Sequence, residues 1–384
     1  MPSALDDRAA LRERFPILSH KTHLISHSLG AMPRAARDHV DEYLRLWDEE
    51  GVVSWHTWLP FVEESGDLIG RILGAPPGSV MMGPNVSFWQ AVIASALDFG
   101  GERNRVVYTA LNFPTVHYVW MEQRRRGAEV VVVPSDDGIS VPTERLLDAI
   151  DERTLIVPIS HVSFRSSALQ DAKAVVEKAH SVGAKVLLDC YQSTGTVPFS
   201  VTDLGVDFAC GGSVKWLCGG PGAAYLYVRP DLVRELRPAA TGWFSHRRPF
   251  DFTMEPIDYA DTIWRFAGGT AAIPALYAAR AGYECVLDVG VERIRAHSLR
   301  LTGLLMDLVE EAGFRLNTPR EPDKRGGTVC FDFPGAERVN EELIRRGFLL
   351  DHRPQCGIRA SPHFYTTEDE VRSLLAETLQ IRVT

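Results

Sequence analysis

The sequence lacks the features that would place it on a membrane or a nucleic acid. No uninterrupted apolar run reaches the roughly 18 residues of a membrane-spanning helix. The formal net charge is -9 at pH 7, and the arginine triplet at 124–126 is too short to supply the basic face that a polyanion requires. The first residues carry no apolar stretch typical of a secretory signal. We therefore expect a cytoplasmic protein that binds neither a membrane nor a nucleic acid.

Metal-binding and nucleotide-binding motifs are also missing. The six cysteines form no C-x-x-C pair and no Cys/His cluster with zinc-finger spacing. We expect buried free thiols and no metal site. No G-x-G-x-x-G follows the first predicted strand, which argues against a Rossmann dehydrogenase.

Hydrophobic patterning between residues 80 and 230 is typical of an α/β protein with a doubly wound, mostly parallel sheet. Short β-branched runs alternate with amphipathic stretches of helical length, as expected for parallel strands joined by crossover helices. Ligands of such sheets bind at the carboxyl ends of the strands. The predicted strands are 106–108, 130–133, 155–163, 185–189, 208–210 and 224–228, and the predicted helices are 88–97, 169–181 and the segment after Pro114.

The pattern changes after the Gly268-Gly269-Thr270 turn. A long helical region, 273–312, precedes a further alternation of strands and helices that suggests a small α+β lobe. The expected division is a large domain over 61–290 and a small C-terminal domain over 291–384. In the small domain we expect a strand at 328–333, a helix at 337–346, an extended run at 348–352 and a last helix from Glu368.

A lysine, Lys215, lies in a glycine-rich segment directly after predicted strand 208–210. Residues 211–222 are Gly-Gly-Ser-Val-Lys-Trp-Leu-Cys-Gly-Gly-Pro-Gly, and such a segment lets a ligand approach the backbone closely. Burial would lower the pKa of the amine and leave it nucleophilic enough to attack an aldehyde cofactor. A surface lysine or one that contacts a phosphate is the alternative.

Predicted strand 185–189 ends in an acid, Asp189. A carboxylate opposite a pyridine nitrogen would keep that ring protonated, and the protonated ring is what makes pyridoxal 5'-phosphate (PLP) an electron acceptor. Gln192 could hydrogen-bond the phenolic oxygen of the same cofactor. The alternatives are a helix N-cap or turn role for Asp189 and a turn role for Gln192.

Two further segments could complete a cofactor site. Asn85, Val86 and Ser87 precede an apolar helix, so their free amide groups and the Ser87 hydroxyl could form a phosphate cradle. Phe113 follows the next strand and could stack on a pyridine ring. The alternatives are a plain N-cap for Ser87 and a core position for Phe113.

These residues belong to a set of motifs that runs through most of the chain. The motifs are Ser26-His27-Ser28-Leu29-Gly30, Ser54-Trp55-His56, Asn112-Phe113-Pro114-Thr115, Ser160-His161-Val162, Asp207-Phe208-Ala209-Cys210, Ser213-Val214-Lys215-Trp216, Gly219-Gly220-Pro221-Gly222, Gly242-Trp243-Phe244, Ile358-Arg359 and Phe364-Tyr365. With them the chain resembles the class V aminotransferase branch of PLP-dependent fold-type-I enzymes, and within that branch kynureninase.

The resemblance implies a PLP enzyme that acts on a small-molecule amino acid. It implies an N-terminal segment, 1–60, packed with the small domain, and a homodimer with active sites at the subunit interface. Arg359 would bind the substrate α-carboxylate through its guanidinium fork, unless it forms a surface salt bridge. The implied cofactor-binding residues are Lys215, Asp189, Gln192, Phe113, Asn85, Val86, Ser87 and Ser213, with Gly269 and Thr270 reaching the neighbouring subunit's phosphate; the further candidates for the substrate side are His27, His56 and Trp243.

The predicted reaction is a kynureninase-like hydrolytic Cβ–Cγ cleavage that yields an anthranilate-type acid and alanine. Three departures from the kynureninase pattern bear on it: Val214 replaces a tyrosine, Val116 replaces an acid, and His27 replaces an asparagine. The alternatives are a C–S β-lyase, a cysteine-desulfurase-like enzyme, or a transamination, decarboxylation or epimerisation. A non-catalytic PLP-binding sensor is a more remote one.

Overall fold

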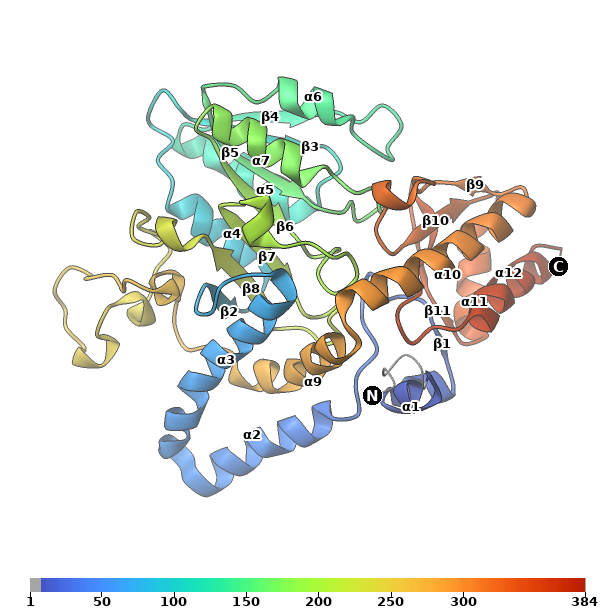
Figure 1. Cartoon of the computed structure of the whole chain (residues 1–384), viewed down its shortest axis with the longest axis horizontal. Coiled ribbons are helices and arrows are strands. Elements are labelled where there is room, and N and C mark those ends of the chain that lie inside the picture. The colour runs from blue at the N-terminus through green and yellow to red at the C-terminus, as the bar shows by residue number, and fades with distance from the viewer. Residues whose placement is uncertain (1–7, 384) are drawn as a thin grey trace.

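A seven-stranded sheet forms the centre of the larger of two lobes (Figure 1). A computed structural model of the protein describes residues 8–383. The strand order is β2-β8-β7-β6-β5-β3-β4, and the five strands from β7 to β4 are parallel. The strands are β2 (Val80–Gly83), β3 (Arg105–Thr109), β4 (Glu129–Val133), β5 (Thr154–Ser160), β6 (Lys185–Asp189), β7 (Phe208–Gly212) and β8 (Ala224–Val228).

The sheet is mostly parallel, as predicted, but β8 departs from that pattern. It runs antiparallel to both of its neighbours, β7 and β2. A parallel crossover needs about a dozen or more residues, usually with a helix, and the connection between β7 and β8 consists only of residues 213–223. The chain therefore turns straight back after β7, and Lys215 lies in this connection.

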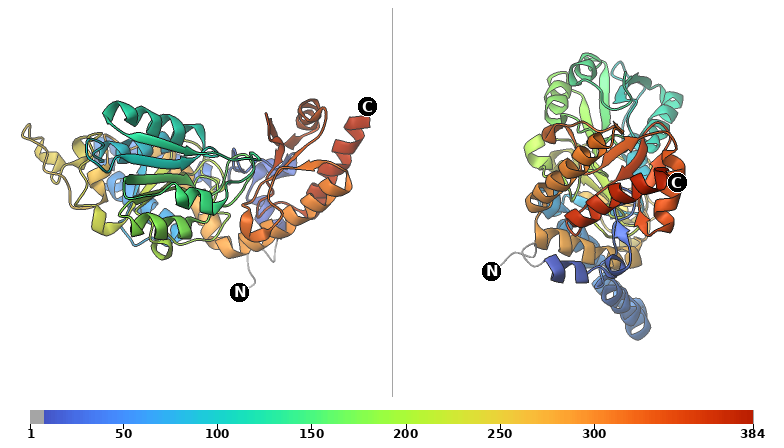
Figure 2. Two further views of the ribbon diagram at one scale, coloured as in Figure 1. Left: turned by 90° about the horizontal axis from the view of Figure 1, so that it is seen from above. Right: turned by 90° about the vertical axis from the view of Figure 1, so that its right-hand side faces the viewer.

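Helices cover both faces of the large sheet, as Figure 2 shows. Strands β7 and β8 are buried along their whole length, and β6 is buried except at Lys185, which explains why these strands are mostly apolar on both faces rather than alternating. No helix within residues 8–383 is both long and apolar enough to cross a membrane. The helices of this lobe that follow the sheet strands are α4 (Val86–Ser95), α5 (Pro114–Glu122), α6 (Thr143–Asp148), α7 (Ala172–Ser181) and α8 (Val201–Leu204).

The smaller lobe has its own antiparallel sheet and its own apolar core, as the patterning after residue 290 predicts. The strand order is β12-β13-β10-β9. The predicted helical region 273–312 is broken at Gly290, which has a φ of 85°. The elements are α9 (Ile273–Val289), α10 (Val291–Glu311), β9 (Arg315–Leu316), β10 (Val329–Asp332), α11 (Ala336–Arg345), β11 (Phe348–Leu349), β12 (Asp351–Arg353), β13 (Gly357–Ala360) and α12 (Glu368–Val383).

The N-terminal segment contacts both lobes. Strand β1 (Thr22–His23) pairs in parallel with β11 of the small lobe, whereas α2 (Ala36–Glu50) packs along α9 and α3 (Trp55–Leu73) packs on β2 and α9. The first helix is α1 (Arg8–Glu13). Residues 1–7 of the predicted segment 1–60 lie outside the described residues.

Two glycines let other segments approach the backbone around Lys215. A Cβ atom at Gly282 of α9 would collide with the carbonyl oxygen of Leu217, and one at Gly30 would collide with the carbonyl oxygen of Lys215. The Gly30 N–H also donates to the carbonyl of Val214 at 2.8 Å. The Lys215 connection is therefore held between α9 and the N-terminal segment.

We expect Gly282→Ala to destabilise the protein by about 1–3 kcal/mol, because the added methyl group overpacks a contact between two backbones. Gly303 on the next helix, α10, is a matched control, since a Cβ there meets no atom within 4 Å. Gly303→Ala should stabilise the protein by about 0.5–1 kcal/mol through helix propensity. Denaturant unfolding of both variants measures whether the free energy of unfolding falls in Gly282→Ala and rises in Gly303→Ala. Equal effects of the two substitutions would contradict the close-packing argument.

Candidate active site

A cavity of about 240 Å³ lies at the carboxyl ends of the central strands. Seven of the residues predicted from the sequence line it, although they come from four separate segments of the chain. Because β2 and β7 point the same way, the helix that follows β2 begins at the same edge as Lys215 and Asp189. The lining residues are Asn85, Val86, Ser87, Phe113, Thr115, Ser160, Val162, Phe164, Asp189, Tyr191, Gln192 and Lys215.

Lys215 extends into this cavity between two aromatic rings. Its Nζ atom lies 4.3 Å from the ring centre of Tyr191 and 5.7 Å from that of Phe113. Burial lowers the pKa of the amine to about 8, a shift that the Asp189 carboxylate opposes and the Arg359 guanidinium reinforces. Lys215 therefore has a larger neutral, nucleophilic fraction near neutral pH than an ordinary lysine.

Asp189 ends β6 and is 5% exposed. Among the described residues, the only hydrogen bond that its carboxylate accepts comes from the backbone N–H of Tyr191, which lies 3.0 Å from Oδ1. Burial raises the pKa of Asp189 to about 6, against the effects of that hydrogen bond and of Lys215. A buried carboxylate with so little compensation favours a cationic partner in the cavity.

Residues at the N-termini of two helices form another part of the cavity wall. Asn85 caps α4 and accepts a hydrogen bond from the N–H of Phe88 at 2.9 Å. The N–H groups of Val86 and Ser87 before it have no intrahelical acceptor, because the helix begins there. The Ser87 hydroxyl lies 3.0 Å from that of Thr115 in the first turn of α5. N–H groups, hydroxyls and two helix dipoles that converge in this way suit a phosphate.

Aromatic and amide groups line the remaining wall of the cavity. Phe113 is 44% exposed and contacts the edge of Phe164, with ring centres 5.1 Å apart. Gln192 is held by both ends of its amide: Nε2 donates to the His27 carbonyl at 3.0 Å, and Oε1 accepts from the Trp216 indole at 2.9 Å. Phe113 is thus free to cover a flat ligand, while Gln192 is fixed at the wall.

Tyr191 was missed in the sequence. It lies two residues after Asp189, where the pattern indicates only a turn, yet its ring is the aromatic group nearest to Lys215. The space for this ring comes from Gly212 at the end of β7, because a Cβ there would lie 2.5 Å from the Tyr191 hydroxyl. The sequence signal that could have identified Tyr191 is a tyrosine just after one strand, with a glycine at the corresponding position of the neighbouring strand.

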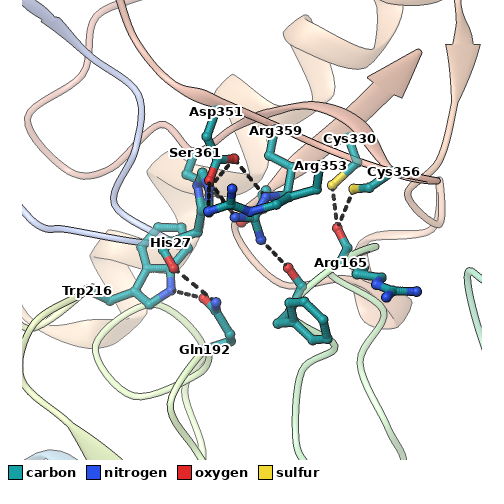
Figure 3. A network of polar contacts seen from close by, with 12 residues as sticks. His27, Arg165, Gln192, Trp216, Cys330, Asp351, Arg353, Cys356, Arg359 and Ser361 are labelled. Carbon is teal, nitrogen blue, oxygen red and sulfur yellow. Dashed lines mark hydrogen bonds and ion pairs between the residues drawn. The ribbon is translucent and has the colours of Figure 1, made fainter. Parts of the chain in front are cut away.

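Arg359 lies at the edge of the cavity in a buried polar network (Figure 3). Its Nε and Nη2 atoms donate to the two carboxylate oxygens of Asp351 at 2.8 and 2.6 Å. Its Nη1 donates at 2.6 Å to the carbonyl of Phe164, whose side chain lines the cavity. His27 lies behind this pair, 3.0 Å from Asp351 and 2.6 Å from the Ser361 hydroxyl. Asp351 was not predicted.

The remaining predicted residues lie away from the cavity within this chain. The Ser213 hydroxyl is hydrogen-bonded to that of Tyr283 and is buried. Gly269 and Thr270 are exposed in the turn before α9, and His56 is exposed at the start of α3. Trp243 is 39% exposed and stacks against Phe252.

The cysteines of this chain are buried and unpaired, as expected from their spacing. Cys330 and Cys356 lie nearest to the Arg359 network, and both thiols donate to the carbonyl of Arg165. Within residues 8–383 no group of three or more His, Cys, Asp or Glu side chains has an arrangement suited to a metal ion.

The cavity fits PLP on three independent observations. Lys215 is a nucleophilic amine, Asp189 is a buried carboxylate that lacks a cationic partner within hydrogen-bonding distance among the described residues, and the two helix N-termini in the wall of the same cavity offer an anion site. The exposed ring of Phe113 lies beside the same space. These residues define the site of a PLP-dependent enzyme.

Comparisons with known proteins agree with this geometry. The family model for class-V aminotransferases matches residues 87–374. An uncharacterized aminotransferase, YcbU, from Bacillus subtilis is 32% identical over 95% of this chain and 96% of its own length. The kynureninase of Pseudomonas fluorescens is 31% identical over 96% of this chain and 91% of its own length. The chain therefore belongs to the class-V aminotransferase family.

Solved structures agree with the fold. A cysteine desulfurase from Thermococcus onnurineus, solved in its apo form, superimposes with a TM-score of 0.87 at 20% identity and covers 97% of both chains. A C-DES mutant with glycine covalently linked to its PLP cofactor gives a TM-score of 0.87 at 20% identity, over 96% of this chain and 98% of that one. The protein is a fold-type-I, PLP-dependent enzyme.

We expect Asp189→Asn to have opposite effects with and without PLP. Without the cofactor the variant should be more stable than the wild type by up to about 3 kcal/mol above pH 6, because burial has raised the pKa of Asp189 from 3.8 to about 6. This difference should shrink as the pH falls from 6 and vanish below pH 3.8, where the side chain is protonated in both the folded and the unfolded state.

With PLP bound, the order should reverse, because the asparagine cannot pair with a pyridinium. Thermal unfolding of apo and PLP-loaded protein across this pH range checks both parts. If PLP stabilised the variant as much as the wild type, Asp189 would not face the cofactor ring.

Proposed function

We propose that the enzyme cleaves a side-chain bond of an L-α-amino acid, and that its reaction is a kynureninase-like hydrolysis of a Cβ–Cγ bond. The observation that carries this proposal is the presence, around one cavity, of a nucleophilic lysine and a buried carboxylate, with a buried arginine at its edge. Kynureninases of about 30% identity that match nearly the whole chain favour this reaction over others of the family.

In this proposal each end of the site has a separate task. When bound, PLP supplies an electron-accepting ring and an aldehyde that links covalently to an amine. The N-termini of α4 and α5 hold its phosphate, Asp189 holds a proton on its ring nitrogen, and Phe113 covers one face. Arg359 binds the substrate α-carboxylate and so orients the Cα–H bond.

Lys215 takes the proton from Cα as a general base, a role that its lowered pKa favours. A γ-carbonyl on the substrate then allows water to add, and cleavage of the Cβ–Cγ bond leaves an acid and alanine. The ring of Tyr191 also lies close to the Lys215 amine, and burial raises the pKa of its hydroxyl to about 12, so it is a proton donor rather than an anion at neutral pH.

A C–S β-lyase is the second candidate, and one observation favours it. Kynureninase-like cleavage adds water to a carbonyl, yet Asp189 is the only carboxylic acid among the residues that line the described cavity. Val116 is fully buried beside the site and offers no acid. An elimination that expels sulfur from Cβ needs no such hydration.

A cysteine-desulfurase reaction fits the site less well, because it requires a cysteine that can reach the substrate. Cys356 is the cysteine nearest to Arg359 in the chain, but its side chain is buried and its thiol donates to the carbonyl of Arg165 at 3.1 Å. Transamination, decarboxylation and epimerisation share the early steps assigned to Lys215 and remain alternatives in the same family.

We expect the purified, PLP-loaded enzyme to release an anthranilate and alanine from L-kynurenine or 3-hydroxykynurenine, with one water consumed. Chromatography of the products checks this. Pyruvate, ammonia and a thiol from an S-substituted cysteine would instead identify the β-lyase. Lys215→Ala is the control, because it should lose both the activity and the visible absorbance band of lysine-bound PLP. No band in the wild type would overturn the PLP assignment itself.

We further propose that the enzyme is a homodimer whose active sites are completed by the partner subunit. The turn that contains Gly269 and Thr270 is exposed and does not line the cavity of its own chain. Apolar side chains that need cover are exposed nearby, with Trp243, Phe250 and Phe252 at 39%, 59% and 71%. Such a surface is typical of a protein interface.

Mixing two defective subunits tests this arrangement. Thr270→Glu should repel the phosphate held by the neighbouring subunit, and Lys215→Ala removes the lysine of its own site. Coexpression of the two variants should restore the PLP absorbance band, since one site of each mixed dimer would be intact. A monomer in analytical ultracentrifugation, or no recovery in mixed dimers, would contradict a shared site.

A further inference from the structure

The half-buried carboxylate of Asp351 accepts two of the hydrogen bonds of Arg359, and Asp351 was not among the predicted site residues. The two residues lie directly opposite each other in the antiparallel pairing of β12 with β13. Cross-strand neighbours on one face of a sheet are about 5 Å apart, so their side chains meet without a long reach. Arg359 is 4% exposed. The pairing is therefore built into the register of the small sheet.

The geometry of the pair leaves part of the guanidinium unused. Asp351 takes one N–H from Nε and one from Nη2, and the Phe164 carbonyl takes one from Nη1. A guanidinium has five N–H groups. In the part of the chain that the structure describes, one N–H on Nη1 and one on Nη2 thus have no acceptor, and each can donate a charge-assisted hydrogen bond to a second carboxylate.

His27 fixes the carboxylate in turn. A carboxylate cannot donate, so the His27 Nε2 atom carries the proton in the 3.0 Å contact with Asp351, and Nδ1 accepts from Ser361 at 2.6 Å. The Thr328 hydroxyl lies 2.8 Å from that of Ser361 and continues the chain. Burial lowers the pKa of His27 to about 4, against the effect of its hydrogen bond to Asp351, so the ring is neutral.

Asp351 is ionised at neutral pH. Burial acts against its ionised form, but the hydrogen bonds from His27 and Arg359 hold the pKa of the carboxyl well below its usual range. Arg353 also approaches Asp351, at 3.1 Å, but its side chain is 51% exposed. That surface contact offers a control that removes another ion pair of the same carboxylate, with a small expected effect.

From this arrangement we infer that Asp351 is a positioning residue for substrate specificity: it holds one edge of Arg359 so that the free N–H groups meet the α-carboxylate of an amino acid. The inference rests on the proposed role of Arg359. It has a clear rival, in which Asp351 merely occupies the arginine until a substrate carboxylate displaces it. The two models differ in sign, because removing a positioning group weakens substrate binding, whereas removing a competitor strengthens it.

The test uses the PLP-loaded enzyme and two ligands that differ only in the α-carboxylate, L-phenylalanine and phenethylamine. Neither has a side-chain bond that the proposed cleavages would break, so binding is measured as the ligand concentration that gives half of the initial change in PLP absorbance. We expect Asp351→Asn to weaken L-phenylalanine binding roughly tenfold, the loss of about one charge-assisted hydrogen bond. Phenethylamine binding should change less than about twofold, and so should both ligands in the control Arg353→Gln.

The remaining outcomes separate the possible failures. Tighter L-phenylalanine binding by Asp351→Asn would support the competitor model and overturn the inference. Equal weakening for both ligands, or loss of the PLP band, would reduce Asp351 to a structural residue. If the wild type bound phenethylamine as well as L-phenylalanine, the proposed carboxylate role of Arg359 would fail first, whichever bond the enzyme cleaves.

Discussion

The structure depends on holding an amine and a carboxylate out of bulk water at the same edge of one sheet. The pKa of Lys215 and the pKa of Asp189 are each shifted toward the neutral form. Burying these two groups therefore lowers the free energy of unfolding before any ligand is bound. The surrounding design follows from that cost. Apolar strands bury the edge, Gly282 and Gly30 allow the Lys215 connection to be enclosed, and the cavity leaves room for a group that supplies the missing charge.

The two lobes contribute different chemistry to the site. In the proposed site the large lobe provides the groups around the cofactor, whereas Arg359 and its partner Asp351 belong to the small lobe. His27 connects the two, because its side chain contacts Asp351 while its backbone carbonyl holds Gln192. The position of the small lobe relative to the sheet therefore sets where a substrate carboxylate can lie. A shift between the lobes would alter substrate binding before it altered cofactor binding.

Much of the fold and of the cofactor site could be predicted from local sequence. The parallel strands are continuous apolar runs, and Asp189 and Lys215 stand out because a polar residue ends or follows such a run. What could not be predicted depends on pairings between distant segments. Strand β13 and the partner of Arg359 follow from the register of β12 with β13, and β8 runs antiparallel because its connection is short. Tyr191 escaped notice because a turn residue gives no periodic signal, and its space depends on Gly212, on another strand.

The parallel pairing of β1 with β11 joins Thr22 to Phe348, so the first strand of the chain completes a sheet whose other strand is among the last to be synthesised. On the ribosome this strand must wait unpaired until nearly the entire chain has emerged. Closing so large a loop carries an entropic cost and slows folding. The large sheet, formed by residues 80–228, can assemble much earlier. Because Gly30 and His27 lie just beyond β1, the substrate side of the active site takes shape only at the end of this sequence of events.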